Sequence, residues 1–201
     1  MKITMVLDVI CAHSYLAYHH LQQALQTHRA AGGSAEVTFL PFQLDPAAPP
    51  TPEPLKTVLQ RKFGPAALDS AAAMAKKAAG EGLVLDYDRA VNANTRSAHL
   101  LITHAERHGR GEEVAERLFR AHFTDGLDIA DPGTLGRLAA EAGLHSTPDA
   151  TDETELTRRL ERTRALAVRA VPVFLADGTT PLVGDQSRAA FERLLAGAPT
   201  A

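Results

Sequence analysis

The chain has a single cysteine, Cys11, and the residues around it are of types that support thiol chemistry. An apolar run at residues 3–7 ends before Cys11 and a helical pattern begins after it, which predicts a thiol at a helix N-terminus. The helix dipole and the free backbone N–H groups there stabilise a thiolate, so a lowered thiol pKa is expected. His13 can add a positive charge or a hydrogen bond. Ser14 lies one helical turn beyond Cys11 and can donate its hydroxyl proton to the sulfur.

The same spacing is compatible with an inert cysteine. Free cysteine is among the most buried residue types in proteins, and a Cys-x-x-Ser segment has no second thiol. Spacing alone is therefore equally compatible with a reactive thiol and with a buried structural cysteine.

A second feature lies far along the chain, where Val171-Pro172 opens another apolar segment. Proline has no backbone N–H for a strand ladder, so it is expected at a strand start, at an edge or in a cis turn. The alternative interpretation is that Pro172 only starts a strand and has no functional role.

The elements that position these residues are predicted from hydrophobic periodicity and turn residues. The N-terminal part has the order strand–helix–strand, which is typical of parallel strands joined by a crossover helix. A proline-rich segment at 41–54 and an almost wholly helical block follow, and the chain ends in the order helix–strand–strand–helix. We expect strands at 2–10, 35–40, 171–176 and 179–183, and helices that end near Gly32 and that cover 55–63, 66–79 and 93–108.

Cap signals set the later helix boundaries. Asp131 followed by proline predicts an N-cap, and Gly143 predicts the end of that helix. Asp152 and Glu155 have the spacing of a capping box, with Asp152 in the capping role, and predict the start of the next helix.

Composition excludes several classes of function. The net charge is −3 and basic residues are spread along the chain, which argues against nucleic-acid binding. No apolar run approaches the roughly 20 residues that span a membrane, and Asp8 interrupts the N-terminal apolar stretch, so no secretory signal is expected. A single cysteine excludes an internal disulfide and a cysteine-rich zinc site and favours a reducing, cytoplasmic setting.

Taken together, these features resemble the thioredoxin fold, and the all-helical insert resembles its DsbA-like branch. Within that branch the chain is similar to the FrnE-like proteins and to their relatives, the kappa-class glutathione transferases and the 2-hydroxychromene-2-carboxylate isomerases. The resemblance spans essentially the whole chain and is carried, in order, by residues 8–16, 39–46, 94–100, 170–174 and 184–186.

The resemblance implies an α/β protein with a thioredoxin fold and an inserted all-helical subdomain. Residues 1–50 and 151–201 would form the thioredoxin-like domain, and residues 51–150 would form the insertion.

It also implies roles for individual residues. Cys11 occupies the position of the family's nucleophilic cysteine, whereas the proline and the resolving cysteine that follow it in the oxidoreductases are here Ala12 and Ser14. Pro172 matches the family's cis-proline, which lies opposite the active-site cysteine. The backbone of Val171 would then be free to pair with an extended thiol-containing substrate.

The transferase and isomerase branch has serine at both ends of the matching segment, with the first serine close to the thiol of glutathione. This chain therefore combines the cysteine of one branch with the serine of the other. Asn94 and Gln186 are candidate contacts for a thiol cofactor, although a helix cap and a turn residue are equally good interpretations.

Three functions follow from this combination. In the first, a thiol oxidoreductase exchanges disulfides through Cys11, with His13 and the helix terminus stabilising the thiolate, and an external thiol resolves the mixed disulfide. In the second, a transferase or isomerase uses a thiol cofactor on a small aromatic electrophile; in the third, a binding protein keeps the fold without turnover. We expect no tightly bound cofactor and no metal, a low-molecular-weight thiol as co-substrate, a small-molecule or thiol/disulfide substrate, no nucleic-acid or membrane partner, and we leave a homodimer open.

The histidines invite a metal site. His104 and His108 are spaced i, i+4 on an expected helix, but Glu106-Arg107 between them indicates a solvated face, so surface histidines are the preferred interpretation. His99 is expected to line the cleft between the insert and the sheet, or simply to pack.

Overall fold

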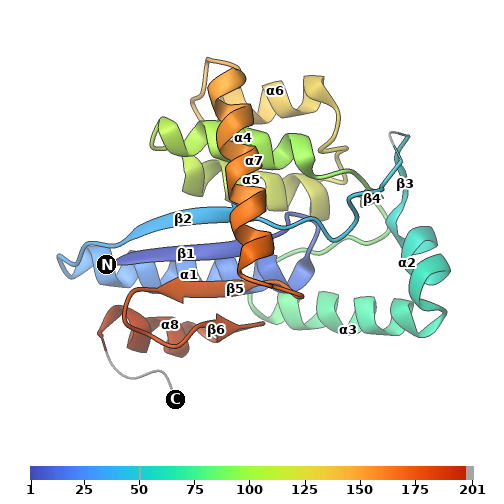
Figure 1. Cartoon of the computed structure of the whole chain (residues 1–201). Helices are drawn as coiled ribbons and strands as arrows, with labels where there is room; N and C mark the ends of the chain where they lie inside the picture. Colours follow the sequence, from blue (N-terminus) through green and yellow to red (C-terminus); the bar gives the residue numbers. More distant parts are fainter. Residues whose placement is uncertain (50, 198–201) are drawn as a thin grey trace.

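β1 (Lys2–Leu7) and β5 (Val173–Ala176) occupy the middle of a four-stranded sheet in the computed structural model (Figure 1). The edges are β2 (Glu36–Pro41) and β6 (Leu182–Val183), in the order β2-β1-β5-β6. β1 is parallel to β2 and antiparallel to β5, and β5 is antiparallel to β6. All β1 residues after Lys2 are buried, as expected for a central strand covered on both faces.

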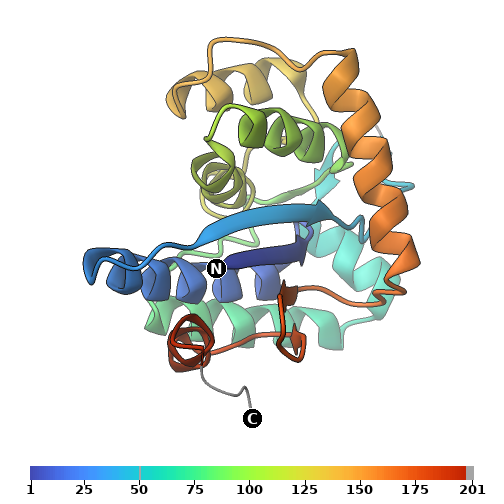
Figure 2. The same ribbon diagram turned by 60° about the vertical axis from the view of Figure 1, so that its left-hand side comes forward.

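Helices cover both faces of this sheet. α1 (Ala12–Ala30) and α8 (Arg188–Leu195) pack against each other on one side (Figure 2, blue and dark red), and α7 (Ala150–Ala165) crosses the other side in Figure 1. Tyr15 of α1 stacks on Phe119 of the helical block, with ring centroids 5.0 Å apart. One hydrophobic core is therefore shared by the sheet, α1 and the block above it.

The chain between β2 and α7 supplies the helical block and a short two-stranded sheet. β3 and β4 pair antiparallel through two residues each. The bounds are β3 (Glu53–Pro54), α2 (Leu55–Phe63), α3 (Ala66–Gly80), β4 (Val91–Asn92), α4 (Arg96–Arg107), α5 (Gly111–Phe123) and α6 (Pro132–Glu141). The structure describes residues 1–49 and 51–197, so residue 50 and residues 198–201 of the two predicted thioredoxin segments lie outside it, and the limits of the insertion stay a prediction.

Several local expectations need correction. The helix predicted over 93–108 begins only at Arg96, because residues 91–92 pair with β3. The strand predicted over 2–10 ends at Leu7, where the chain turns toward α1. The capping box of α7 is shifted by one turn, since Asp149 is the N-cap and Asp152 lies at the third helical position.

Other local expectations are confirmed. Asp131 caps α6 by accepting a hydrogen bond from the backbone N–H of Thr134 at 2.6 Å. Gly32 and Gly143, just after α1 and α6, have positive φ, which glycine adopts without the steric cost of a Cβ. Among the described residues, no helix has both the length and the apolar character needed to cross a bilayer.

Candidate functional site

Cys11 is the N-cap residue of α1, as the sequence predicts. Its backbone N–H donates to the carbonyl of Asp8 and its carbonyl accepts from the N–H of Tyr15, both at 3.0 Å, so the turn that ends β1 leads directly into the helix. The start of α1 and the start of β5 lie at the same end of the sheet (Figure 1). The thiol is therefore held between a helix N-terminus and the segment that precedes β5.

Val171 and Pro172 form the opposite wall of the site. The Val171–Pro172 peptide bond is cis, as expected. The Cys11 Sγ lies 3.6 Å from the Val171 carbonyl oxygen, to which the thiol donates. The Val171 N–H donates to no acceptor among the described residues.

The pKa of Cys11 is raised, and the sequence-based expectation of a lowered pKa is wrong. The side chain is buried, with 8% of the residue exposed, and burial disfavours the thiolate. The Ser14 hydroxyl and the N–H groups of Ser14 and His13 favour the thiolate and so oppose this effect, and the charge of Asp8 adds to it. Desolvation outweighs the helix N-terminus here, so most of the thiol is neutral at pH 7.

Ser14 and His13 differ in what they offer the sulfur. Ser14 is fully buried, and its Oγ has no hydrogen-bond partner among the described residues while the thiol is neutral. Its proton is therefore free to be donated when Cys11 ionises. The His13 side chain is exposed, and this residue reaches the sulfur through its backbone N–H.

A buried polar group that the sequence interpretation did not use lies behind the thiol. The Asp8 side chain is fully buried; its Oδ2 accepts from the backbone N–H of Leu44 at 2.7 Å, and its Oδ1 is 3.3 Å from the Nε2 of His99. His99 also contacts the Phe42 carbonyl oxygen at 2.9 Å, so it joins the helical block to the end of β2. Its side chain is buried, in agreement with the packing alternative. The apolar–polar break at Asp8 was the only sequence signal for this group.

His122 of α5 is a second missed residue. It is fully buried, neither ring nitrogen has a hydrogen-bond partner among the described residues, and its ring packs edge-on against Phe123. Burial lowers the pKa of His122 to about 4, although the charge of Asp8 acts in the opposite direction. The imidazole is thus neutral at physiological pH, and nothing in the sequence pattern distinguishes it from a surface histidine.

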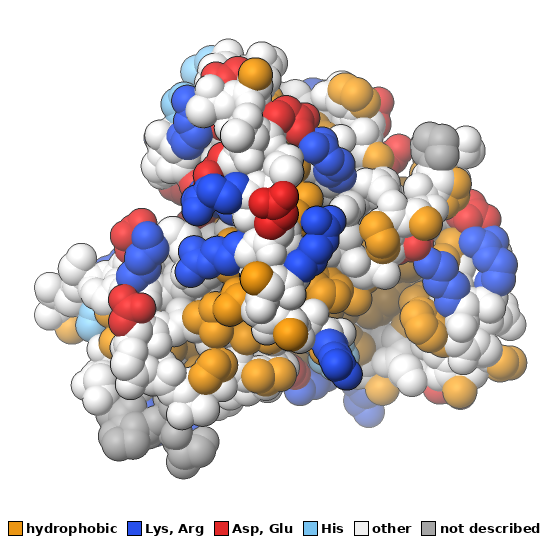
Figure 3. All heavy atoms as spheres, viewed as in Figure 1, with side chains coloured by type: hydrophobic (Ala, Val, Ile, Leu, Met, Phe, Trp, Pro, Cys, Tyr) orange, Lys and Arg blue, Asp and Glu red, His pale blue; other side chains and the backbone are white. Residues whose placement is uncertain are grey.

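The surroundings of Cys11 are largely apolar. The partly buried side chains of Phe42, Val168 and Leu175 pack against the small cluster that contains Cys11. Figure 3 shows hydrophobic side chains gathered over β5 and the end of α7, with a hollow between them and the α2–α3 region. Burial, with a smaller contribution from the charge of an ionised Cys11, raises the pKa of Tyr87 to about 12.

Asn94 and Gln186 have structural contacts. Asn94 Oδ1 accepts from the backbone N–H of Arg96 at 3.0 Å, and its Nδ2 donates to the carbonyl of Pro46 at 3.0 Å. Gln186 Nε2 donates to the Val183 carbonyl at 2.7 Å. These are contacts of turn residues, since Asn94 precedes the N-cap residue Thr95 of α4, and a role for either residue in holding a thiol cofactor stays a prediction.

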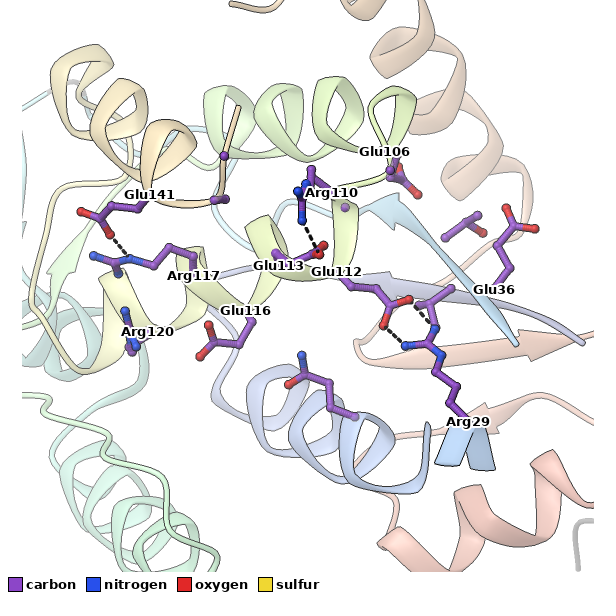
Figure 4. A pocket seen from close by; sticks show the side chains of 17 residues that line it. Arg29, Glu36, Glu106, Arg110, Glu112, Glu113, Glu116, Arg117, Arg120 and Glu141 are labelled. Atoms are coloured by element: carbon purple, nitrogen blue, oxygen red, sulfur yellow. Dashed lines mark hydrogen bonds and ion pairs between the residues drawn. The ribbon is translucent and has the colours of Figure 1, made fainter. Parts of the chain in front are cut away.

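A separate cavity of about 960 Å³ lies at the other end of α1 and is lined by arginines and glutamates (Figure 4). Arg29 in the last turn of α1 pairs with Glu112 in the first turn of α5 through two hydrogen bonds of 3.1 and 2.6 Å. The Nε of Arg117 lies 2.5 Å from the Oε2 of Glu141. Because arginines and glutamates pair with one another here, the cavity has no uniform charge that would attract an anion or a cation. The Arg29–Glu112 pair joins α1 to the helical block.

One sequence interpretation of the histidines is wrong. His104 is buried, at 2% exposure, rather than on the surface, because its ring is enclosed by the segment that leads into α7. His108, one turn later, is exposed as expected. No group of three or more potential metal ligands occurs in the part of the chain that the structure describes.

Comparison with solved structures supports the fold. The chain is 25% identical to a probable DsbA oxidoreductase from Streptomyces coelicolor, with a TM-score of 0.84 over 98% of this chain and 89% of that one. The cytosolic disulfide reductase DsbM from Pseudomonas aeruginosa is 22% identical, with a TM-score of 0.66 over 98% and 100% of the two chains. A 2-hydroxychromene-2-carboxylate isomerase is 14% identical, with a TM-score of 0.66 over 98% and 92%.

No protein with a curated description matches the sequence. Residues 2–196, however, match the DsbA-like thioredoxin domain. The expected thioredoxin fold with a helical insertion is thereby confirmed, and so is the resemblance to its DsbA-like branch. This chain belongs to the DsbA-like thioredoxin-domain family.

Proposed function

We propose that this protein is a monothiol oxidoreductase that exchanges disulfides through Cys11. The observation that carries the proposal is the position of the Cys11 sulfur: it lies at the start of α1, 3.6 Å from the carbonyl that precedes cis Pro172. A substrate strand that pairs with the free N–H of Val171 would present its disulfide to this sulfur. Membership in a family with oxidoreductase neighbours supports an enzymatic role.

The reaction has two exchange steps. The Cys11 thiolate attacks one sulfur of a substrate disulfide, a Cys11–substrate disulfide forms, and the other substrate sulfur leaves as a thiolate that takes up a proton. The chain has no other cysteine to resolve this bond. An external thiolate then attacks the substrate sulfur, forms a new disulfide with it and releases the Cys11 thiolate. In sum, one substrate disulfide is exchanged for another and one external thiol is consumed.

The chain's own residues would act on the thiolate. Ser14 and the N–H groups at the start of α1 stabilise the negative charge that the buried site otherwise disfavours. Because the pKa of Cys11 is raised, attack on a disulfide is slower than at an acidic thiol, but the sulfur is also a stronger nucleophile once ionised. The raised pKa also makes Cys11 a slower leaving group when the external thiolate resolves the mixed disulfide, so turnover requires an abundant external thiol. We expect such a thiol in a reducing compartment such as the cytoplasm.

Glutathione is the first external thiol to test. The neighbour DsbM is a cytosolic disulfide reductase, and one of its structures is described with GSH. Incubation with oxidised glutathione should add one glutathione to the protein on intact-mass analysis, and reduced glutathione should remove it. The purified protein should also accelerate reduction of a glutathionylated peptide by glutathione, and Cys11→Ser should abolish both effects.

Ser14→Cys is the matched variant. It restores a Cys-x-x-Cys segment, so a second thiol can displace the bound glutathione, and the adduct should give way to an internal disulfide. The exposed Ser70→Ala serves as the neutral control. Absence of any Cys11 adduct, in protein shown to be folded, would overturn the proposal.

A thiol-cofactor-dependent transferase or isomerase is the second candidate. The neutral state of Cys11 and the apolar side chains of Phe42 and Val168 favour a small aromatic electrophile over a charged one. Such an enzyme should bind glutathione saturably by calorimetry and should keep part of its activity in Cys11→Ser. Binding without turnover of either kind would instead indicate the non-catalytic protein.

A further inference from the structure

A polar cluster outside the thiol site links three separate elements of the chain. His104 lies on α4, Asp152 on α7, and Ser146 in the segment that joins α6 to α7. The His104 Nδ1 is 2.8 Å from the Asp152 Oδ2, and the His104 Nε2 is 2.9 Å from the Ser146 Oγ. His104 and Asp152 are buried, whereas Ser146 is exposed. A carboxylate, an imidazole and a hydroxyl thus follow one another from the interior to the surface.

The carboxylate fixes the state of the imidazole. Burial alone would raise the pKa of Asp152, but hydrogen bonds from the Asp149 N–H, from Arg107 and from His104 hold that pKa below its ordinary value. An ionised carboxylate only accepts hydrogen bonds, so the His104 Nδ1 must carry the proton. The Nε2 of a neutral ring is then an acceptor that faces the Ser146 hydroxyl. This is the arrangement in which a histidine acts as general base toward a serine nucleophile.

A cavity of about 440 Å³ adjoins the serine. It lies between α4, α6 and the segment before α7, at the end of the molecule far from β5 (Figure 2). Its lining includes Ser146 itself and the apolar side chains Leu100, Leu101, Leu135, Leu144 and Pro148. The volume falls within the range of small-molecule sites, roughly 300–1,000 Å³. A small apolar group in it would therefore sit beside the nucleophile.

Two candidate donors for a developing oxyanion belong to the serine itself and to the residue after it. Within residues 1–49 and 51–197, the backbone N–H groups of Ser146 and Thr147 donate to no acceptor. A backbone N–H at the nucleophile itself is a common donor in such sites, where each donor contributes about 100-fold or more to the rate.

We propose that Ser146, His104 and Asp152 form a second active site that hydrolyses esters with small apolar acyl groups. The Ser146 Oγ attacks the ester carbonyl while its proton passes to His104 Nε2; the alkoxide leaves and takes that proton, which gives an alcohol and an acyl-Ser146. Water then attacks the acyl group, and its proton passes through His104 back to Ser146. The products are one alcohol and one carboxylic acid from one ester and one water.

This activity is independent of the thiol chemistry. The cluster lies at the start of α7, and the chain reaches Val171 only after its end. A helix of the 16 residues in α7 is about 24 Å long. No residue is shared between the two sites.

The test uses the whole chain with Cys11→Ala, because a thiol also attacks activated esters. A fluorophosphonate probe should label the folded protein at Ser146, as located by peptide mass analysis, and p-nitrophenyl butyrate should be hydrolysed. Ser146→Ala should remove the label, and His104→Gln should slow labelling by about 100-fold, the order of a lost general base. Ser70→Ala, an exposed serine on α3 without an imidazole partner, should label as the parent does.

Asp152 is left unchanged in this test because it also accepts from the Asp149 N–H and completes the cap of α7. Thermal melts of each variant show whether it is folded, and Ser146→Ala removes only an exposed hydroxyl, so it reports on chemistry even if His104→Gln unfolds. Absence of labelling in the folded parent, labelling at another serine, or labelling that survives Ser146→Ala would overturn the proposal.

Discussion

Ser14→Ala tests the claim that a buried hydroxyl is reserved for the thiolate of Cys11. In the native protein this hydroxyl is fully buried and has no hydrogen-bond partner among the described residues while the thiol is neutral. Its removal should therefore leave the free energy of unfolding at pH 7 unchanged or slightly higher, since an unsatisfied buried polar group is destabilising. The loss should appear only when Cys11 ionises.

The magnitude follows from the strength of a hydrogen bond to a charged group. Such a bond contributes about 1.5–3 kcal/mol, and at about 1.4 kcal/mol per pKa unit its loss should raise the pKa of Cys11 by about 1–2 units. The thiolate fraction at pH 7 falls by the same factor, but the more basic thiolate is more nucleophilic, with a Brønsted slope of about 0.45. The net alkylation rate should thus fall by about 3- to 13-fold at pH 7.

The assay is the rate of iodoacetamide alkylation against pH, followed by intact mass. Cys11 is the only cysteine, so the wild-type protein gives a single reacting group without background. Ser70→Ala is the control for a serine that does not adjoin the sulfur. An unchanged alkylation profile in Ser14→Ala would refute the claim that this hydroxyl stabilises the thiolate. A marked loss of free energy of unfolding at pH 7 would show that the hydroxyl stabilises the folded protein while the thiol is neutral.

Three further outcomes are expected. Asp8→Asn removes a negative charge that raises the pKa of Cys11, so alkylation at pH 8 should become faster, the opposite of Ser14→Ala. Burial lowers the pKa of His122 to about 4, so the unfolded chain binds a proton that the folded protein does not as pH falls below 6.5. In urea titrations, wild-type protein should therefore lose about 3 kcal/mol more free energy of unfolding than His122→Phe between pH 7.5 and pH 4. Burial raises the pKa of Cys11 above its unfolded value, so its stabilising contribution is complete below about pH 8.5 and is lost as pH rises toward the folded pKa. Denaturation midpoints should accordingly fall more steeply from pH 8 to pH 10 in wild type than in Cys11→Ala, and parallel curves would contradict the assigned burial.

Local sequence signals were sufficient to place Cys11 at the start of a helix and Pro172 next to a strand, because an apolar run and a helical pattern are properties of neighbouring residues. The cis bond at Pro172 and its position opposite Cys11 were expected from the resemblance to the DsbA-like family. The parallel pairing of β1 with β2 follows from the crossover helix between them. These features could be predicted because the fold adds little to what each segment prefers on its own.

The direction of the Cys11 pKa shift could not be predicted in this way. It depends on how completely the thiol is removed from water, and the groups that cover it come from distant parts of the chain. Val171 is 160 positions away from Cys11, and Phe42 and Val168 also pack on its cluster. A helix N-terminus lowers a thiol pKa only where desolvation is modest, and this is a property of the tertiary structure.

The misassignment of His104 has a similar cause. Its neighbours Glu106 and Arg107 suggested a solvated face, yet both are ion-paired to α7 rather than free in water. Glu106 pairs with Arg159, and Arg107 lies 2.7 Å from the Asp152 carboxylate. The charged residues on this helix therefore lie at an interface between α4 and α7, and His104, which precedes them, is buried there.

These same contacts explain why the helical block matters to the thiol. Glu106 of α4 accepts from the backbone N–H of Phe39 in β2 at 2.9 Å and also pairs with Arg159 of α7, so one carboxylate fixes α7 against the sheet. The end of α7 leads within a few residues to Val171, whose carbonyl meets the Cys11 sulfur. The geometry of the thiol site thus depends on the pairing of β5 with β1 and also on the contacts that join α7 to α4 and β2.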